Sequence, residues 1–140
     1  ALAGVAFTPD IYKCAVSING VSDVEEMLDT EKRDHGSHHW VVSYWQEVIS
    51  KGEVDEDHLA KISPINYVQN VKTPLLLIHG ERDEVVSVKQ SRNMLEELED
   101  ADKEVKYLEL EGGNHYLSRS ENRMKAILAI DEFLKQHIKI

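Results

Sequence analysis

Short apolar runs alternate along the chain with longer segments in which apolar residues recur at helical spacing. Three runs predict buried strands, at residues 13–19, 74–80 and 105–110. Helical spacing recurs in residues 1–7, 38–49, 55–62, 87–98 and 118–137, and residues 21–37 predict a surface loop with a short helix. Strands that alternate with helices predict an α/β fold, with a mostly parallel sheet and helical crossovers.

The helix predicted at residues 38–49 is unusually aromatic. Trp40, Tyr44 and Trp45 fall on one side of it, because their spacing matches the helical repeat. These side chains could form one wall of a substrate site or the buried stripe of an amphipathic helix. The pattern favours the buried stripe.

Composition limits the partners of the chain. Its 140 residues are 41% hydrophobic, enough to bury a core as one domain or as part of a larger one. The net charge of -10 repels phosphate backbones and anionic membranes, so neither nucleic acid nor a membrane is expected as a partner. The longest apolar stretches fall far short of the ~20 residues that span a bilayer. The single Cys14 leaves the compartment open.

Two polar loops follow the second and third predicted strands. Residues 79–86 contain Asp83, and residues 111–116 contain His115. The carboxyl ends of neighbouring parallel strands meet at one edge of the sheet, so the two side chains are expected to lie close together. A carboxylate can fix the tautomer of a histidine that acts as a general base, and Asp before His is the order of an α/β-hydrolase triad. On spacing alone, Asp83 is explained equally well as a turn cap.

A nucleophilic serine is missing from the expected motif. The sequence contains no Gly-x-Ser-x-Gly elbow, and its nearest match, residues 20–24, lacks the second glycine. Ser22 is therefore interpreted as a loop hydroxyl or a helix cap. The small residues of segment 1–7 suit the helix that follows such an elbow. We expect residues 1–140 to be a partial domain that lacks the upstream strands, with the nucleophile just before Ala1.

Several segments carry a resemblance to a known family: residues 1–23, 63–68, 73–80, 83, 85–86, 90–91, 94 and 115–118. They resemble the C-terminal part of the catalytic domain of the prolyl oligopeptidase family, of the dipeptidyl aminopeptidase and acylaminoacyl peptidase type. The resemblance implies an α/β-hydrolase fold, cleavage of short peptides by a Ser-Asp-His triad, and no cofactor. It makes Asp83 the triad acid and His115 the general base.

Other interpretations remain open beside this one. The parent protein could be a carboxylesterase or lipase, since the two loops recur across the hydrolase fold. The chain could instead be a non-catalytic fragment that self-associates to cover an exposed sheet edge, and we expect an isolated fragment to be homo-oligomeric. His35, His38 and His39 have a tempting spacing for a metal, but no fourth ligand follows at a diagnostic distance, so no metal is expected. His79 ends a buried strand and is expected to be structural.

Overall fold

A parallel sheet of three strands forms the centre of the structure, a computed structural model that describes residues 1–51 and 54–138. The strands β1 (Ala15–Ile18), β2 (Leu75–Gly80) and β3 (Val105–Leu110) lie side by side in chain order. Each runs parallel to its neighbour, with Leu75 between Ala15 and Val105. The predicted α/β fold with a parallel sheet is confirmed, and each strand lies within its predicted run.

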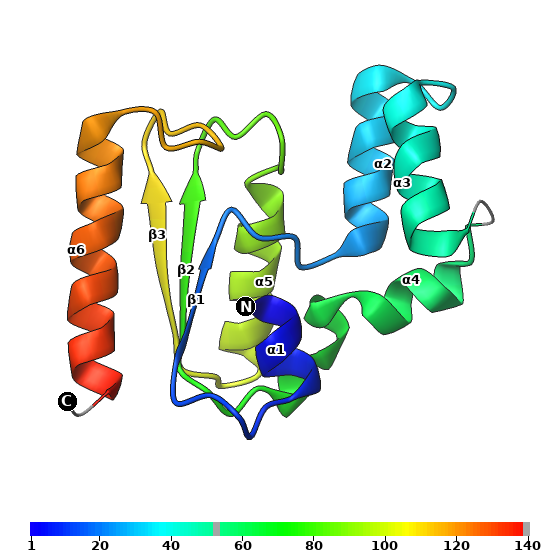
Figure 1. Cartoon of the computed structure of the whole chain (residues 1–140). Helices are drawn as coiled ribbons and strands as arrows, with labels where there is room; N and C mark the ends of the chain where they lie inside the picture. The colour runs from blue at the N-terminus through cyan, green and yellow to red at the C-terminus, as the bar shows by residue number, and fades with distance from the viewer. Residues whose placement is uncertain (52–53, 139–140) are drawn as a thin grey trace.

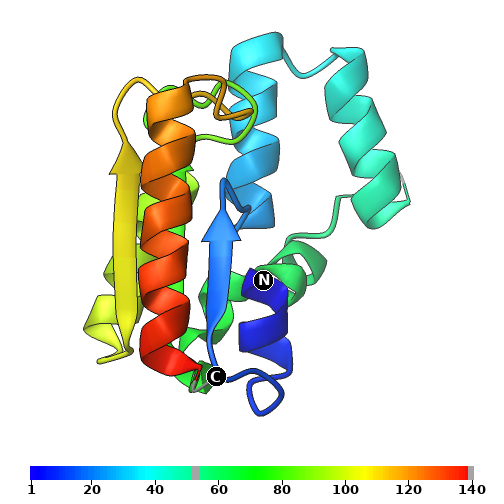
Figure 2. The same ribbon diagram turned by 60° about the vertical axis from the view of Figure 1, so that its left-hand side comes forward.

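Helices connect the strands and cover both faces of the sheet. They are α1 (Leu2–Phe7), α2 (Val24–His35), α3 (Trp40–Ser50), α4 (Glu56–Ile62), the 3-10 segment η1 (Pro64–Asn70), α5 (Lys89–Asp100) and α6 (Ser120–His137). Figures 1 and 2 show α6 on one face of the sheet and α1 and α5 on the other. None of the helices in the described ranges is both long and apolar enough to cross a bilayer.

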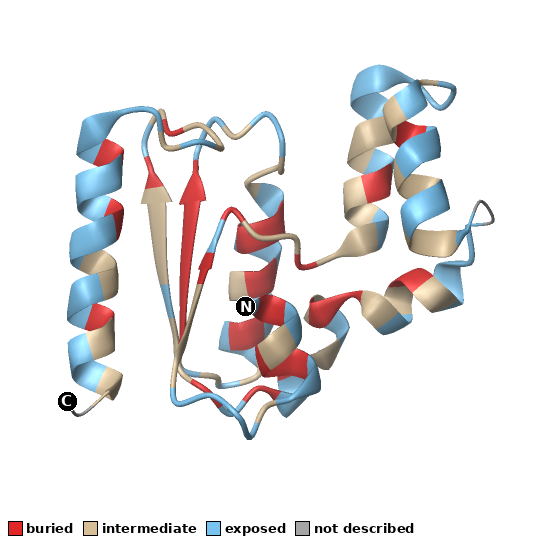
Figure 3. Cartoon of the chain, in the orientation of Figure 1, coloured by how far each residue is buried: buried red, intermediate tan, exposed pale blue. Residues whose placement is uncertain are grey.

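The central strand β2 supplies the core on both faces. All of its residues are buried, which explains why its sequence is an almost continuous apolar run (Figure 3). One cluster packs against α1 and α5 and consists of Leu2, Val5, Val68, Val71, Leu75, Leu77, Met94 and Leu98. A second packs under α6 and consists of Leu76, Ile78, Leu110, Ala126 and Phe133. Alternate residues of β2 therefore point to opposite faces, as the pleat of a strand requires.

Helix α2 is longer than the short helix that the sequence predicts. The Asp23 carboxylate accepts hydrogen bonds from the backbone N–H groups of Glu25 and Glu26, and these bonds begin the helix. It ends at Gly36, whose φ of 88° few other residues adopt. The acidic first turn and basic last turn match the helix dipole, and Leu28 is fully buried. The density of charge in this segment concealed these helix signals.

The predicted buried stripe on α3 is wrong. Only Val42 of this helix is buried, whereas Trp40 is 71% exposed, Tyr44 52% and Val48 57%. Helix α3 packs on α2, and together they form a hairpin of helices, the α2–α3 hairpin (residues 24–50), which stands beside the sheet (Figure 1). One neighbouring helix covers too little of α3 to bury its aromatic side.

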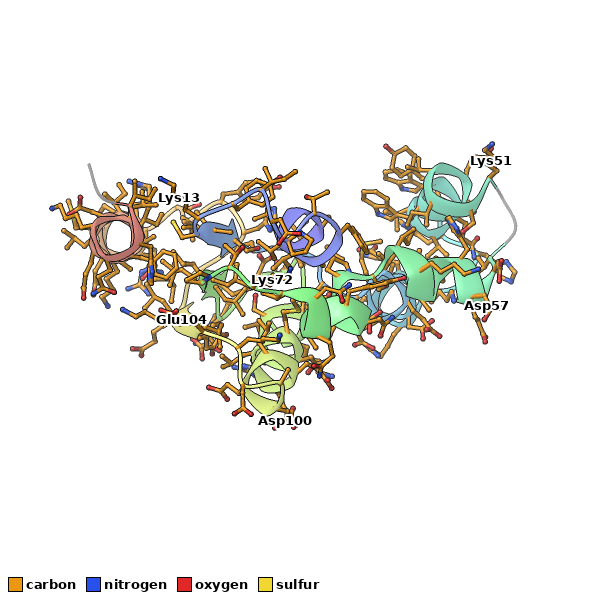
Figure 4. All side chains as sticks on the ribbon, turned by 90° about the horizontal axis from the view of Figure 1, so that it is seen from below. Lys13, Lys51, Asp57, Lys72, Asp100 and Glu104 are labelled. Atoms are coloured by element: carbon orange, nitrogen blue, oxygen red, sulfur yellow. The ribbon has the colours of Figure 1, made fainter. Side chains whose placement is uncertain are left out.

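The two ends of the sheet differ in chemistry. Lys13, Lys72 and Glu104 precede the three strands and lie at the end shown in Figure 4. There Lys72 forms an exposed ion pair with Asp10, at 2.8 Å between Nζ and Oδ1. The loops that follow β2 and β3 lie together at the other end, where ligand sites of parallel sheets form.

Candidate functional site

The loops after β2 and β3 are fastened to each other through their backbones. The N–H of Arg82 donates to the carbonyl oxygen of Gly113 at 2.8 Å, and the N–H of Glu81 donates to that of Leu110 at 3.0 Å. A Cβ atom on Gly80 would lie 2.6 Å from the Gly113 oxygen, so only glycine permits this approach. The two loops that the sequence singles out therefore form one structural unit.

The side chain of Asp83 is buried in this unit, and both of its carboxylate oxygens have partners. Its Oδ1 accepts hydrogen bonds of 2.8 Å from the backbone N–H groups of Val85 and Val86. Its Oδ2 lies 2.8 Å from Nδ1 of His115. The side chain is fully closed to solvent, so water does not compete for these bonds. Asp83 thus both caps the turn and holds an imidazole.

His115 is partly exposed, whereas the side chain of its partner Asp83 is closed to solvent. The side chain of His115 is 29% exposed, and within the described ranges its Nε2 has no hydrogen-bond partner. Because an ionised carboxylate only accepts, Nδ1 carries the proton in the neutral ring and Nε2 presents a lone pair. An imidazole held in this way can take a proton from a hydroxyl that approaches Nε2.

Asn19 joins the end of β1 to the end of β2 and to the loop after β3, and the sequence analysis did not single it out. Its Nδ2 donates to the backbone oxygen of His115 at 2.8 Å, and its Oδ1 accepts from the N–H of Gly80 at 3.0 Å. The residue lies just after β1 and has a φ of 49°, which asparagine tolerates better than most residues. A buried polar residue directly after an apolar strand was the available signal.

His79, near the end of β2, holds the loop that carries Asp83 through a hydrogen bond to its backbone. Its Nε2 lies 2.9 Å from the backbone oxygen of Val86, and its Nδ1 lies 2.7 Å from Oγ of Ser91. Its Nε2 is also 3.5 Å from Oδ2 of Asp83. Burial lowers the pKa of His79, so the ring is neutral, donating from Nε2 and accepting at Nδ1. The structural role expected for this residue is confirmed.

Ser22 has no access to the pair. It is fully buried, and its hydroxyl donates to the backbone oxygen of Gln90 at 2.7 Å. The side chain of Gln90 in turn accepts from the backbone N–H groups of Ser22 and Asp23, both at 2.8 Å. These bonds tie the segment after β1 to α5, and the interpretation of Ser22 as a loop hydroxyl is confirmed.

His35 ends α2 and His39 caps the start of α3, so these two histidines lie where the two helices of the hairpin are joined. The rings of His35 and His39 stack with their centroids 5.0 Å apart. Nδ1 of His39 accepts from the N–H of Val41, which caps α3. In the ranges that the structure describes, no three ligating side chains converge as a metal site requires.

A cavity of about 480 Å³ opens beside the His115 ring. The α2–α3 hairpin and the loops after β2 and β3 enclose it. Its lining comprises Val21, Met27, Glu31, His35, Val41, Trp45, Glu84, Val85, Val86 and His115. Of the three aromatic residues singled out in the sequence, Trp45 alone lines this cavity, so the substrate-wall interpretation fits Trp45 rather than Trp40 or Tyr44.

Comparisons with known proteins agree with this arrangement. The chain is 29% identical over 140 residues to dipeptidyl aminopeptidase BIII of Pseudoxanthomonas mexicana, covering 96% of this chain and 19% of that protein. It is 30% identical over 124 residues to esterase LipC of Mycobacterium tuberculosis, covering 82% and 31%. The structure resembles Pyrococcus horikoshii acylaminoacyl peptidase with a TM-score of 0.80 and 30% identity, covering 94% of this chain and 21% of that one.

The chain thus spans between a fifth and a third of the length of these relatives. Its sequence matches the prolyl oligopeptidase family over residues 1–140, which confirms the resemblance noted from its motifs. The shared part includes the sheet, both loops and the helices around them. The chain belongs to the prolyl oligopeptidase family.

Proposed function

We propose that this chain is the part of a serine peptidase catalytic domain that supplies the acid and the base, Asp83 and His115, for the hydrolysis of short peptides. The observation that carries the proposal is the 2.8 Å contact between Oδ2 of Asp83 and Nδ1 of His115, which leaves Nε2 accessible. Membership of the prolyl oligopeptidase family and the likeness to peptidases support it.

In this mechanism His115 moves the proton and Asp83 directs the ring. Nε2 of His115 removes the proton from a seryl hydroxyl as the oxygen attacks the peptide carbonyl, and then delivers it to the leaving amine. Asp83 keeps the proton of the neutral ring on Nδ1 and stabilises the imidazolium that forms. The acyl-enzyme is released by water, with His115 again as the base.

The seryl hydroxyl is proposed to come from outside residues 1–140. The sequence contains no Gly-x-Ser-x-Gly motif, and the hydroxyl of Ser22 is buried in a bond to Gln90. The relatives are three to six times longer than the matched region, which leaves room for the serine in a segment before Ala1. Residues 1–140 alone are therefore expected not to turn over.

An active-site serine probe tests the proposal. A fluorophosphonate should label the complete polypeptide that contains residues 1–140, and should leave residues 1–140 alone unlabelled. Labelling of the complete polypeptide should depend on His115, since the base activates the serine. Labelling of residues 1–140 alone, or none of the complete polypeptide, would contradict it.

Esterase action is the second candidate, and the 30% identity to esterase LipC favours it. An ester needs the same base and acid but has a better leaving group than an amide. Hydrolysis of peptide p-nitroanilides and of p-nitrophenyl esters by the complete polypeptide separates the two. Turnover of esters with none of peptides would replace the peptidase assignment.

We also propose that residues 1–140 produced alone form a homo-oligomer. Among the residues that the structure describes, β1 pairs only with β2 and leaves its other edge open, and Ile18 at its end is 44% exposed. Helix α6 also leaves Ile127 and Leu128 each 59% exposed. An unpaired strand edge next to apolar surface promotes association. Sedimentation velocity should give a mass of at least two chains, and a clean monomer would contradict the proposal.

A further inference from the structure

The cavity beside His115 has an uneven lining. Six of its residues present apolar side chains: Val21, Met27, Val41, Trp45, Val85 and Val86. Its lining residues come from the α2–α3 hairpin, from the segment after β1 and from the two loops, which overlap with α2 in the view of Figure 2. Its volume of about 480 Å³ accommodates an amino-acid side chain. Apolar walls of this kind fit a hydrocarbon stem.

Two carboxylates line the same cavity, one from α2 and one from the loop after β2. Glu31 comes from α2, one helical turn after Met27, so both residues point to the same side of the helix. Glu84 comes from the loop after β2, next to Asp83. No lysine or arginine is among the lining residues in the described ranges. The described lining of this cavity therefore contains no fixed cation, although Arg33 lines an adjoining pocket together with both carboxylates and pairs with Glu26 and Asp34 instead.

Glu31 stands out among the carboxylates of α2. Its side chain is only 16% exposed, whereas those of Asp29 and Asp34 are 53% and 60% exposed. The basic residues of the helix bind elsewhere, since Lys32 pairs with Asp29 and Arg33 approaches Glu26 and Asp34.

Its nearest basic group in the described ranges is Nε2 of His35, at 3.7 Å from a carboxylate oxygen of Glu31. That distance is too long for a hydrogen bond. A carboxylate that is largely removed from water and lacks a hydrogen-bonded cation is stabilised by a ligand that brings one. The ligand that fits combines a cationic head with an apolar stem, because apolar side chains and the two carboxylates line the same cavity.

We propose that this cavity receives a lysine or arginine side chain of the peptide substrate, next to the bond that is cleaved, and that Glu31 determines this preference. The inference rests on the proposed function, since His115 lines the same cavity and would act on the adjoining carbonyl. Glu84 adds to the negative potential from the loop side. A free amino terminus is the other source of a cation, and the test separates the two.

The test uses the complete polypeptide and two acetylated dipeptide p-nitroanilides that end in lysine or in norleucine. Norleucine keeps the hydrocarbon stem and lacks the ammonium group. The wild-type protein should prefer lysine in kcat/KM by roughly tenfold or more, as one charge-assisted hydrogen bond implies. Glu31→Gln should remove most of this preference by lowering kcat/KM for lysine, with little change for norleucine.

Matched variants and substrates keep the result interpretable. Glu99→Gln, on the exposed last turn of α5, removes one negative charge away from the cavity and should retain the preference. Fluorophosphonate labelling of Glu31→Gln should equal that of the wild type, which shows that the variant is folded and that acid and base are intact.

Three outcomes would overturn the inference. Equal kcat/KM for lysine and norleucine in the wild type is the first, and an unchanged preference in Glu31→Gln is the second. The third is an effect of Glu31 seen with free amino termini but absent with acetylated substrates, since the cavity would then bind the terminal ammonium. These failures leave labelling intact, whereas loss of both labelling and hydrolysis in the wild type refutes the proposed function itself.

Discussion

The sheet and the α2–α3 hairpin are built on different principles. Every residue of β2 is buried and its side chains pack on both faces, whereas α3 buries only Val42. Figure 3 shows this contrast as a buried centre beside a largely exposed hairpin. The sheet fixes Asp83 and His115, while the hairpin supplies Glu31 and Trp45 to the cavity. The proposed acid and base are thus held by the well-buried region, and the less buried region supplies part of the lining of the proposed substrate cavity.

Substitution of the proposed acid, Asp83, or the proposed base, His115, should lower kcat far more than any substitution on the exposed side of the hairpin. His115→Ala should lower kcat of the complete polypeptide roughly 10⁶-fold, and Asp83→Asn about 10⁴-fold, because the base is lost in the first and misdirected in the second. Rates on a peptide p-nitroanilide measure both. Val48→Ala, on the exposed side of the hairpin, should keep the wild-type kcat. Wild-type turnover by His115→Ala would contradict the assignment.

A substitution in the core of the sheet should lower the free energy of unfolding much more than one on the exposed side of the hairpin. Leu77→Ala opens a cavity in β2 and should lower the free energy of unfolding by about 2–5 kcal/mol. Val48→Ala should lower it by less than about 0.5 kcal/mol, since the side chain is already half exposed. The urea dependence of hydrogen exchange in peptides that cover β2 measures both. Similar losses in the two variants would refute the contrast in packing.

His79 should make the sheet region sensitive to acid. Burial lowers its pKa from the ordinary 6.5, so below pH 6.5 the unfolded chain binds a proton that the folded chain does not. The contribution of His79 to the free energy of unfolding is therefore constant above pH 6.5. It falls as the pH drops toward the pKa that His79 has in the folded protein, by up to about 1.4 kcal/mol per pH unit. His79→Gln should flatten this part of the stability curve. A variant with an unchanged slope would exclude His79 as the cause.

The smallest effect is expected at the start of the hairpin. Asp23→Ala removes the side chain that caps α2 and should destabilise that helix by about 1 kcal/mol. Hydrogen exchange should quicken in α2 and stay unchanged in β2. Asp23→Ser retains a capping oxygen and should restore most of the protection. Equal acceleration in β2 would mean that the two regions unfold together.

The contrast between the regions also explains what the sequence could predict. The run Leu75–Gly80 predicts β2 closely, because a strand buried on both faces leaves a local signature that few other elements share. The loops with Asp83 and His115 follow from that strand and the next, so their meeting is predictable from strand order. The positions of these two loops could therefore be predicted from the sequence without knowing where the hairpin lies.

The hairpin was less predictable because its environment is set by distant contacts. The aromatic spacing of α3 identifies a helix with an apolar side but does not say what covers that side, and Trp40 and Tyr44 are left exposed. The role inferred for Glu31 depends on the distance between α2 and the loop after β2, which no local pattern encodes. Asn19 was missed because a single amide has no periodicity.

The hydrogen bonds of Asn19 have a mechanical consequence. The Asn19 amide, directly after β1, bonds to Gly80 at the end of β2 and to His115 in the loop after β3, so a displacement of one of these segments is transmitted to the other two. Asp83 and His115 are therefore attached to one group of strand ends, and none of these bonds involves the neighbouring hairpin. In the proposed mechanism, substitutions in the hairpin can therefore change the lining of the cavity without breaking the contact between Asp83 and His115.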